Sequence, residues 1–138
     1  MIIVDSSFWV ALANRSDSHH PQAKAYYNSL NEDLVTTWPV MAETCHLLLQ
    51  RLGVHAQLTF IKAWIDGAFE VSDIPPETDE RIYVLMKKYA DLPMDLADAS
   101  LVILAEILGH GRILSTDRRD FKTYRWKTRK PFLNLLEA

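Results

Sequence analysis

The sequence predicts an α/β protein in which a parallel sheet of about five strands is flanked by helices on both faces. Two observations carry this prediction: short apolar runs alternate along the chain with helical patterns, and glycines and prolines mark the boundaries between them. Strands that alternate with helices form parallel sheets, because each helix returns the chain to the edge where the previous strand began. A length of 138 residues with 49% hydrophobic residues suits one domain, spanning residues 1–138, with its own core.

The first half of the chain is expected to contribute two strands and four helices. Ser6 or Ser7 suits the cap of the first helix, while Pro21 and Pro39 each suit a first helical turn. Gly53 is expected to end the third helix. The expected elements are a strand at residues 2–4, helices at 8–14 and 21–30, a strand at 34–37, and helices at 39–51 and 54–66.

The second half is expected to add two helices and three strands. A helix follows Pro75 and Pro76 and is broken by Pro93, since proline cannot continue a helix. Gly109 and Gly111 are expected to end the next helix. The expected elements are a strand at residues 69–71, a helix to about residue 90, a helix at 95–108, and strands at 113–116 and 132–136.

The charge is unevenly distributed along the chain. Residues 1–117 carry 8 basic and 16 acidic side chains, whereas residues 118–130 carry 7 basic and 1 acidic. A local basic tract on an acidic protein indicates a polyanion contacted from one edge. A solvated terminal segment without a partner remains an equal alternative.

Several classes of protein are disfavoured. Cys45 is the only cysteine, so no disulfide is possible within the chain and a reducing, cytoplasmic location is expected. No apolar run reaches the length of a membrane span, and Asp5 interrupts the first apolar run, so neither a signal peptide nor a membrane segment is expected. The sequence lacks the glycine motifs of serine hydrolases and nucleotide sites, and its histidines lack zinc spacing.

Two acids are expected at the same edge of the sheet. Asp5 ends the first predicted strand and Asp117 ends the fourth, and the carboxyl ends of parallel strands lie together. Either aspartate could instead cap the helix that follows it. Convergence of these aspartates with further acids is therefore what favours a catalytic role for them.

Asp98 lies in a helix that is apolar around most of its circumference. Its helical neighbours include Leu101 and Val102, so an ionised carboxylate there needs a cation or strong hydrogen bonds. The structural alternative is an acid interacting with the helix N-terminus. Asp95 is predicted to be the cap of this helix, and Glu43, alone, has an ordinary polar helix face. Clustered carboxylates favour hard cations, so magnesium or manganese is the expected metal.

Four stretches of the sequence resemble, in this order, the PIN-domain nucleases, and in particular the VapC toxins of prokaryotic toxin–antitoxin pairs. They are Ile2-Ile3-Val4-Asp5-Ser6-Ser7, Glu43 on a helix, Asp98-Ala99, and Ser115-Thr116-Asp117-Arg118-Arg119-Asp120-Phe121.

The resemblance implies a Rossmann-like PIN domain that cleaves RNA, often transfer RNA, with Mg²⁺ or Mn²⁺. By this resemblance, Asp5, Glu43, Asp98 and Asp117 are the catalytic, metal-binding acids, and Ser7 and Thr116 support them. It also implies a cognate antitoxin and a homodimer. Asp120 resembles an occasional extra acid and is left outside the predicted site.

Basic residues near Asp117 are the expected RNA contacts. Trp126 or Tyr124 could stack on a base, with core packing as an equal alternative. The predicted phosphate contacts are Arg118, Arg119, Lys122, Arg125 and Lys127.

Two rival functions follow from the same residues. One is a non-catalytic module that binds RNA or a partner, with the acids as a relic or a structural cation site. The other is a carboxylate phosphatase, which is disfavoured because Ser6 and Ser7 follow Asp5 where an Asp-x-Asp motif is required.

Overall fold

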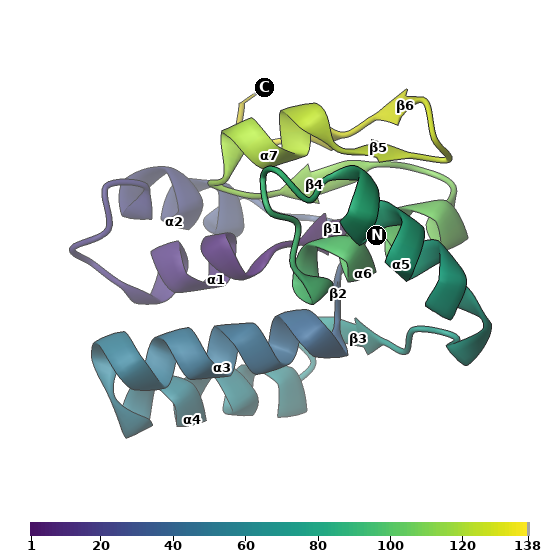
Figure 1. Ribbon diagram of the computed structural model, residues 1–138. Coiled ribbons are helices and arrows are strands. Elements are labelled where there is room, and N and C mark those ends of the chain that lie inside the picture. Colours follow the sequence, from purple (N-terminus) through teal and green to yellow (C-terminus); the bar gives the residue numbers. More distant parts are fainter. Residues whose placement is uncertain (138) are drawn as a thin grey trace.

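The centre of the structure, a computed structural model that describes residues 1–137, is a five-stranded sheet in the order β3-β2-β1-β4-β7 (Figure 1). All four strand pairs are parallel, which confirms the predicted sheet. The strands are β1 (Ile2–Val4), β2 (Leu34–Thr37), β3 (Glu70–Ser72), β4 (Arg112–Leu114) and β7 (Leu133–Asn134).

Helices connect these strands, and a small antiparallel hairpin lies outside the main sheet. The helices are α1 (Ser6–Ala13), α2 (His20–Asn28), α3 (Trp38–Leu52), α4 (Val54–Ile65), the 3₁₀ turn η1 (Pro76–Thr78), α5 (Asp79–Lys88), α6 (Leu96–Leu108) and α7 (Arg118–Thr123). The hairpin pairs β5 (Arg125–Trp126) with β6 (Lys130–Pro131). Within residues 1–137, no helix is long and apolar enough to cross a bilayer.

Side chains of the central strands alternate between two apolar cores, one on each face of the sheet. Ile3 and Ile113 pack with residues of α5 and α6, whereas Ile2, Val4 and Leu114 pack with residues of α1, α3 and α4. Burial on both faces explains why β1 is a continuous apolar run rather than an alternating one. Each buried aliphatic side chain contributes about 1.5–3 kcal/mol through the hydrophobic effect. The prediction of helices on both faces is confirmed.

Helix α6 begins and ends as the sequence predicts. The Asp95 side chain accepts a hydrogen bond from the Asp98 backbone N–H at 2.8 Å, so Asp95 is the N-cap. Gly109 follows the last residue with φ 78°, a left-handed conformation that glycine adopts without strain. Gly111 has a different role, since a Cβ there would lie 2.5 Å from the Trp126 indole nitrogen.

The cap of α1 differs from the prediction. Asp5 itself is the N-cap, because its Oδ1 accepts a hydrogen bond from the Ser6 N–H at 2.8 Å, and the helix begins at Ser6 rather than at residue 8. The prediction of Ser6 or Ser7 as the cap is therefore wrong. Both hydroxyls are consequently available to contact other side chains.

Helix α7 and the β5–β6 hairpin were not predicted. Phe121 is the only buried residue of α7, so this helix of six residues has no readable apolar period. The hairpin turn places Lys127 (φ 46°) and Thr128 (φ 70°) in the left-handed region, without the glycine or asparagine that normally marks such turns. Tyr124 and Trp126, which both lie before this turn, are 0% and 7% exposed. Core packing is confirmed, and base stacking on these two rings is excluded.

Candidate active site

The four predicted acids line one cleft at the carboxyl ends of the central strands. The cleft has a volume of about 240 Å³, and its floor is formed where α1, α3, α6 and the segment after β4 meet. Each acid comes from a different element, so the chain is folded back on itself to bring them together. The acids that line it are Asp5, Glu43, Asp98 and Asp117, together with Asp17 and Asp95.

Asp5 is the most buried of these acids, with 5% of its surface exposed. Its Oδ2 accepts hydrogen bonds from the Ser7 hydroxyl at 2.9 Å and the Ser115 hydroxyl at 2.8 Å. Burial raises the pKa of Asp5, and these hydrogen bonds oppose that rise. The carboxylate is thus held in one orientation by one donor from α1 and one from the end of β4.

The same two serines fix the loop that carries Asp117. The Ser7 hydroxyl accepts a hydrogen bond from the Thr116 N–H at 3.0 Å, and the Ser115 hydroxyl accepts one from the Asp117 N–H at 3.0 Å. The predicted support from Ser7 matches this geometry, whereas Thr116 contributes its backbone N–H. Ser115 is fully buried and was not predicted as a site residue, although it directly precedes Thr116 and Asp117.

Glu43 is half-buried on α3 and is oriented by Ser6. The Ser6 hydroxyl donates a hydrogen bond to Glu43 Oε1 at 2.7 Å. Burial is the largest cause of a raised pKa at Glu43, and the nearby charges of Asp95 and Asp5 add to it. Ser6 is a second residue whose role the sequence did not reveal.

Asp98 combines a structural contact with a place in the cleft. Its Oδ2 accepts hydrogen bonds from the Tyr124 hydroxyl at 3.0 Å and, at 3.4 Å, from the Asp95 N–H in a capping box. Burial, followed by the charges of Asp95 and Asp5, raises the pKa of Asp98 to about 8. Asp95 is therefore both the predicted cap and a negative charge at the cleft.

Asp117 is the N-cap of α7. Its Oδ1 accepts a hydrogen bond from the Asp120 N–H at 3.2 Å, which agrees with the capping alternative, and it also lines the cleft. Burial and the proximity of Asp120 raise the pKa of Asp117 to about 6. Burial is the largest cause of the raised pKa at all four acids, and like charges in the cleft add to it.

The donor chemistry of the cleft fits a hard divalent cation. Carboxylate and hydroxyl oxygens line it, and the described residues place no histidine or cysteine there. Among residues 1–137, however, no three acidic, histidine or cysteine side chains are already arranged to hold one ion. Magnesium is commonly held by one or two carboxylates and several waters, so its binding does not require such a group.

The predicted RNA-contacting residues differ in their surroundings. Arg125 donates hydrogen bonds to backbone carbonyls at the end of α7, the shortest being 2.7 Å to Lys122, so its side chain closes that helix. The Lys127 ammonium lies over the Trp126 ring, with its Nζ 6.0 Å from the ring centroid. The three cations of α7 contact acids: Arg118 and Lys122 pair with Glu137, and Arg119 pairs with Asp120.

Known proteins are similar to this chain in sequence. Residues 2–127 match the PIN domain family. Ribonuclease VapC26 of Mycobacterium tuberculosis is 30% identical over 124 residues, covering 90% of this chain and 92% of that protein. The 23S rRNA-specific endonuclease VapC20 of the same organism is 28% identical over 100 residues, covering 72% of this chain and 76% of that protein.

A solved structure shares the fold. The crystal structure of Mycobacterium tuberculosis VapC20, a sarcin-ricin loop cleaving toxin, superimposes with a TM-score of 0.78 at 24% identity. The superposition covers 85% of this chain and 90% of that chain. The match over residues 2–127 and the similarity to VapC26 over 90% of this chain together show that this chain belongs to the PIN domain family.

Proposed function

We propose that this protein is an endoribonuclease that hydrolyses RNA phosphodiester bonds in the acidic cleft and acts as the toxin of a toxin–antitoxin pair. The observation that carries the proposal is the convergence of Asp5, Glu43, Asp98 and Asp117 from four elements on one cleft. Membership of the PIN domain family and similarity to proteins named as VapC ribonucleases support the choice of RNA.

We propose that these four acids hold Mg²⁺ or Mn²⁺. When bound, such a cation lowers the pKa of water and offsets charge on the phosphate. Asp5 and Asp98 are the first choice as direct ligands, because Asp5 is fixed by serine donors and Asp98 by Tyr124. Glu43 and Asp117 complete the set or orient water through hydrogen bonds. We also propose a homodimer, an antitoxin partner and transfer RNA as substrate, which the family resemblance implies. We propose a cytoplasmic location because Cys45 is the single cysteine of the sequence.

The function is tested by incubating the purified protein with RNA and Mg²⁺ and mapping the product ends. We expect discrete internal cuts, because an endonuclease attacks within the chain. Double-stranded and single-stranded DNA of the same sequence serve as controls. A protein that binds the RNA without cutting it would instead support the non-catalytic binding module.

The hairpin turn is proposed as an RNA contact, because Lys127, Arg129 and Lys130 form no ion pair among residues 1–137. Changing these three residues to glutamine should weaken RNA binding and lower the log–log salt slope by about 0.7–0.9 for each lost phosphate contact. Arg125 is left intact because it closes α7. The control is Lys87→Gln with Lys88→Gln on α5, and an unchanged slope in the hairpin variant would mean that the tract is only solvated.

A further inference from the structure

Arg51 is the only basic side chain among the residues that line the acidic cleft. It lies in the last turn of α3 and is exposed. Glu43, Leu47 and Arg51 are spaced four residues apart, so they share one face of α3, and all three line the cleft. The helix that supplies one of the acids therefore also supplies a positive charge to the same cavity.

The Arg51 guanidinium forms no ion pair with any acid of residues 1–137. This distinguishes it from Arg118, Arg119 and Lys122 of α7, each of which already contacts a carboxylate. The six acids that line the cleft create a negative electrostatic potential that attracts the Arg51 guanidinium. Because Arg51 is exposed, its guanidinium can still contact a ligand. Its five N–H donors match the geometry of a phosphate.

The proposed function creates a requirement for such a group. An RNA strand carries a negative phosphate at every nucleotide, and a cleft lined by acids repels the phosphates that flank the scissile one. The Arg51 backbone lies about 12 Å along α3 from Glu43, from eight residues at 1.5 Å each. We propose, given the endoribonuclease function, that Arg51 binds a backbone phosphate beside the scissile one and acts as a positioning residue for the strand.

A purely structural role for Arg51 predicts different behaviour. A basic residue in the last turn of a helix stabilises the helix dipole by about 0.3–1 kcal/mol. Loss of that interaction lowers the melting temperature without changing RNA affinity. Lys87 occupies the same last-turn position in α5 and is not among the residues that line the cleft, so Lys87→Gln is the matched control.

The test is a binding measurement with a fluorescently labelled 20-nucleotide RNA in Ca²⁺, with gel analysis to verify that the RNA stays intact. We expect Arg51→Gln to raise Kd about tenfold and to lower the salt slope by about 0.7–0.9, the value for one phosphate contact. Arg51→Lys should restore part of the affinity, because it keeps the charge but loses the two-pronged contact. Lys87→Gln should match the parent. With a cleavable RNA in Mg²⁺, Arg51→Gln should raise KM far more than it lowers kcat.

Neutral methylphosphonate links, placed one at a time along the RNA, locate the contact. In the parent protein one or two positions should weaken binding, and at those positions Arg51→Gln should add no further loss. The assignment would be overturned if Arg51→Gln and the neutral link weakened binding additively at every position. It would also be overturned if Arg51→Gln and Lys87→Gln changed the RNA affinity equally. If coupling to one phosphate is found but no RNA is cut in Mg²⁺, the phosphate site stands and the nuclease function fails. If RNA is cut without such coupling, only the role of Arg51 fails.

Discussion

Asp98→Asn is expected to abolish RNA cleavage while leaving the fold intact. Asparagine keeps the shape of the side chain and can still accept the hydrogen bond from the Tyr124 hydroxyl, but it removes the negative charge. If Asp98 is a direct ligand, the loss should exceed the roughly 10- to 100-fold effect of removing a supporting residue. The metal-free variant should be at least as stable as the parent at neutral pH, because the pKa of about 8 means that ionising Asp98 costs folding free energy.

Asp95→Ala is the matched control, since Asp95 lies three residues earlier at the same helix end. It removes the cap of α6 and should cost about 0.5–2 kcal/mol of stability. Its negative charge also raises the pKa values of Asp98 and Glu43, so part of that cost is offset by reduced repulsion. Substantial cleavage should remain. If Asp98→Asn retains cleavage while Asp95→Ala loses it, the two assignments must be exchanged.

The sheet and the order of its helices could be predicted because the local signals agree with the final environment. The apolar runs of β1 and β2 are buried on both faces, and Gly53 and Gly109 lie where α3 and α6 end. Because the carboxyl ends of parallel strands lie at the same edge of a sheet, Asp5 and Asp117 could also be placed on the same side of the molecule. Strand pairing itself did not need to be known for that inference.

Three residues that support the cleft acids, Tyr124, Ser115 and Ser6, could not be predicted in that role, because it depends on contacts between distant parts of the chain. Tyr124 contacts Asp98 across 26 positions, and Ser115 contacts Asp5 across 110. Neither spacing forms a motif, and a tyrosine in a basic tract looks like an RNA-stacking residue until its burial is known. Ser6 was predicted as a possible cap of α1. Because Asp5 is the cap instead, the Ser6 hydroxyl donates to Glu43 and orients it.

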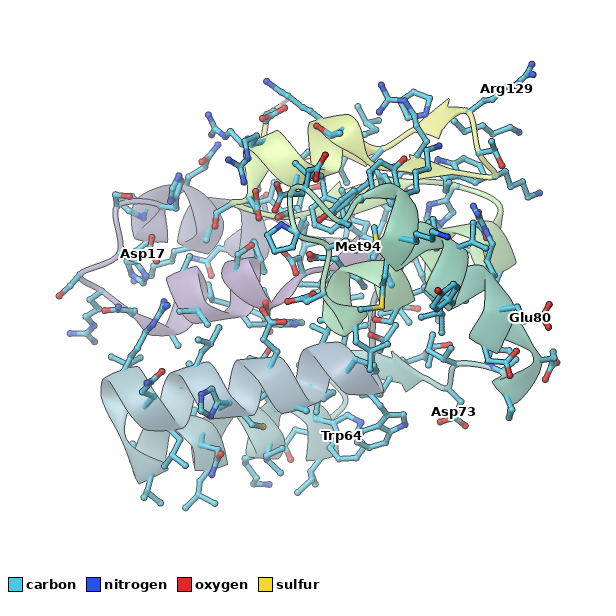
Figure 2. All side chains as sticks on the ribbon, in the orientation of Figure 1. Asp17, Trp64, Asp73, Glu80, Met94 and Arg129 are labelled. Carbon is cyan, nitrogen blue, oxygen red and sulfur yellow. The ribbon has the colours of Figure 1, made fainter. Side chains whose placement is uncertain are left out.

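The contacts of the basic residues 118–130 could not be predicted either. The sequence contains seven basic side chains between residues 118 and 130, but it does not show which of them contact an acid or a carbonyl group of the protein. Glu137 and Asp120 contact the cations of α7, and Arg125 contacts backbone carbonyls. Arg129 at the hairpin and Asp17 at the cleft lie on opposite sides of the molecule (Figure 2). None of the seven cations of the tract lines the cleft, whereas Arg51 does.

Removal of divalent cations is expected to abolish RNA cleavage completely, and Mg²⁺ or Mn²⁺ should restore it. The reason is the donor set of the cleft, whose carboxylate and hydroxyl oxygens suit a hard divalent cation. The measurement is cleavage in excess chelator, followed by titration with Mg²⁺, Mn²⁺ or Zn²⁺. Full activity in chelator, or recovery with Zn²⁺ alone, would contradict the assignment of a hard cation.

Thermal unfolding gives an independent measure of the same site. Without cations, the pKa values of Asp98 (about 8) and Asp117 (about 6) lie above the ordinary 3.8, so the native state holds protons that the unfolded chain has lost. Their contribution to stability is therefore greatest near pH 4 and is lost as the pH rises toward 8. If Mg²⁺ binds the ionised carboxylates of the native state as proposed, the increase in Tm that it causes should grow between pH 5 and pH 8. Asp95→Ala should keep this increase and Asp98→Asn should lose most of it, whereas an equal increase in both variants would mean that Mg²⁺ binds outside the cleft.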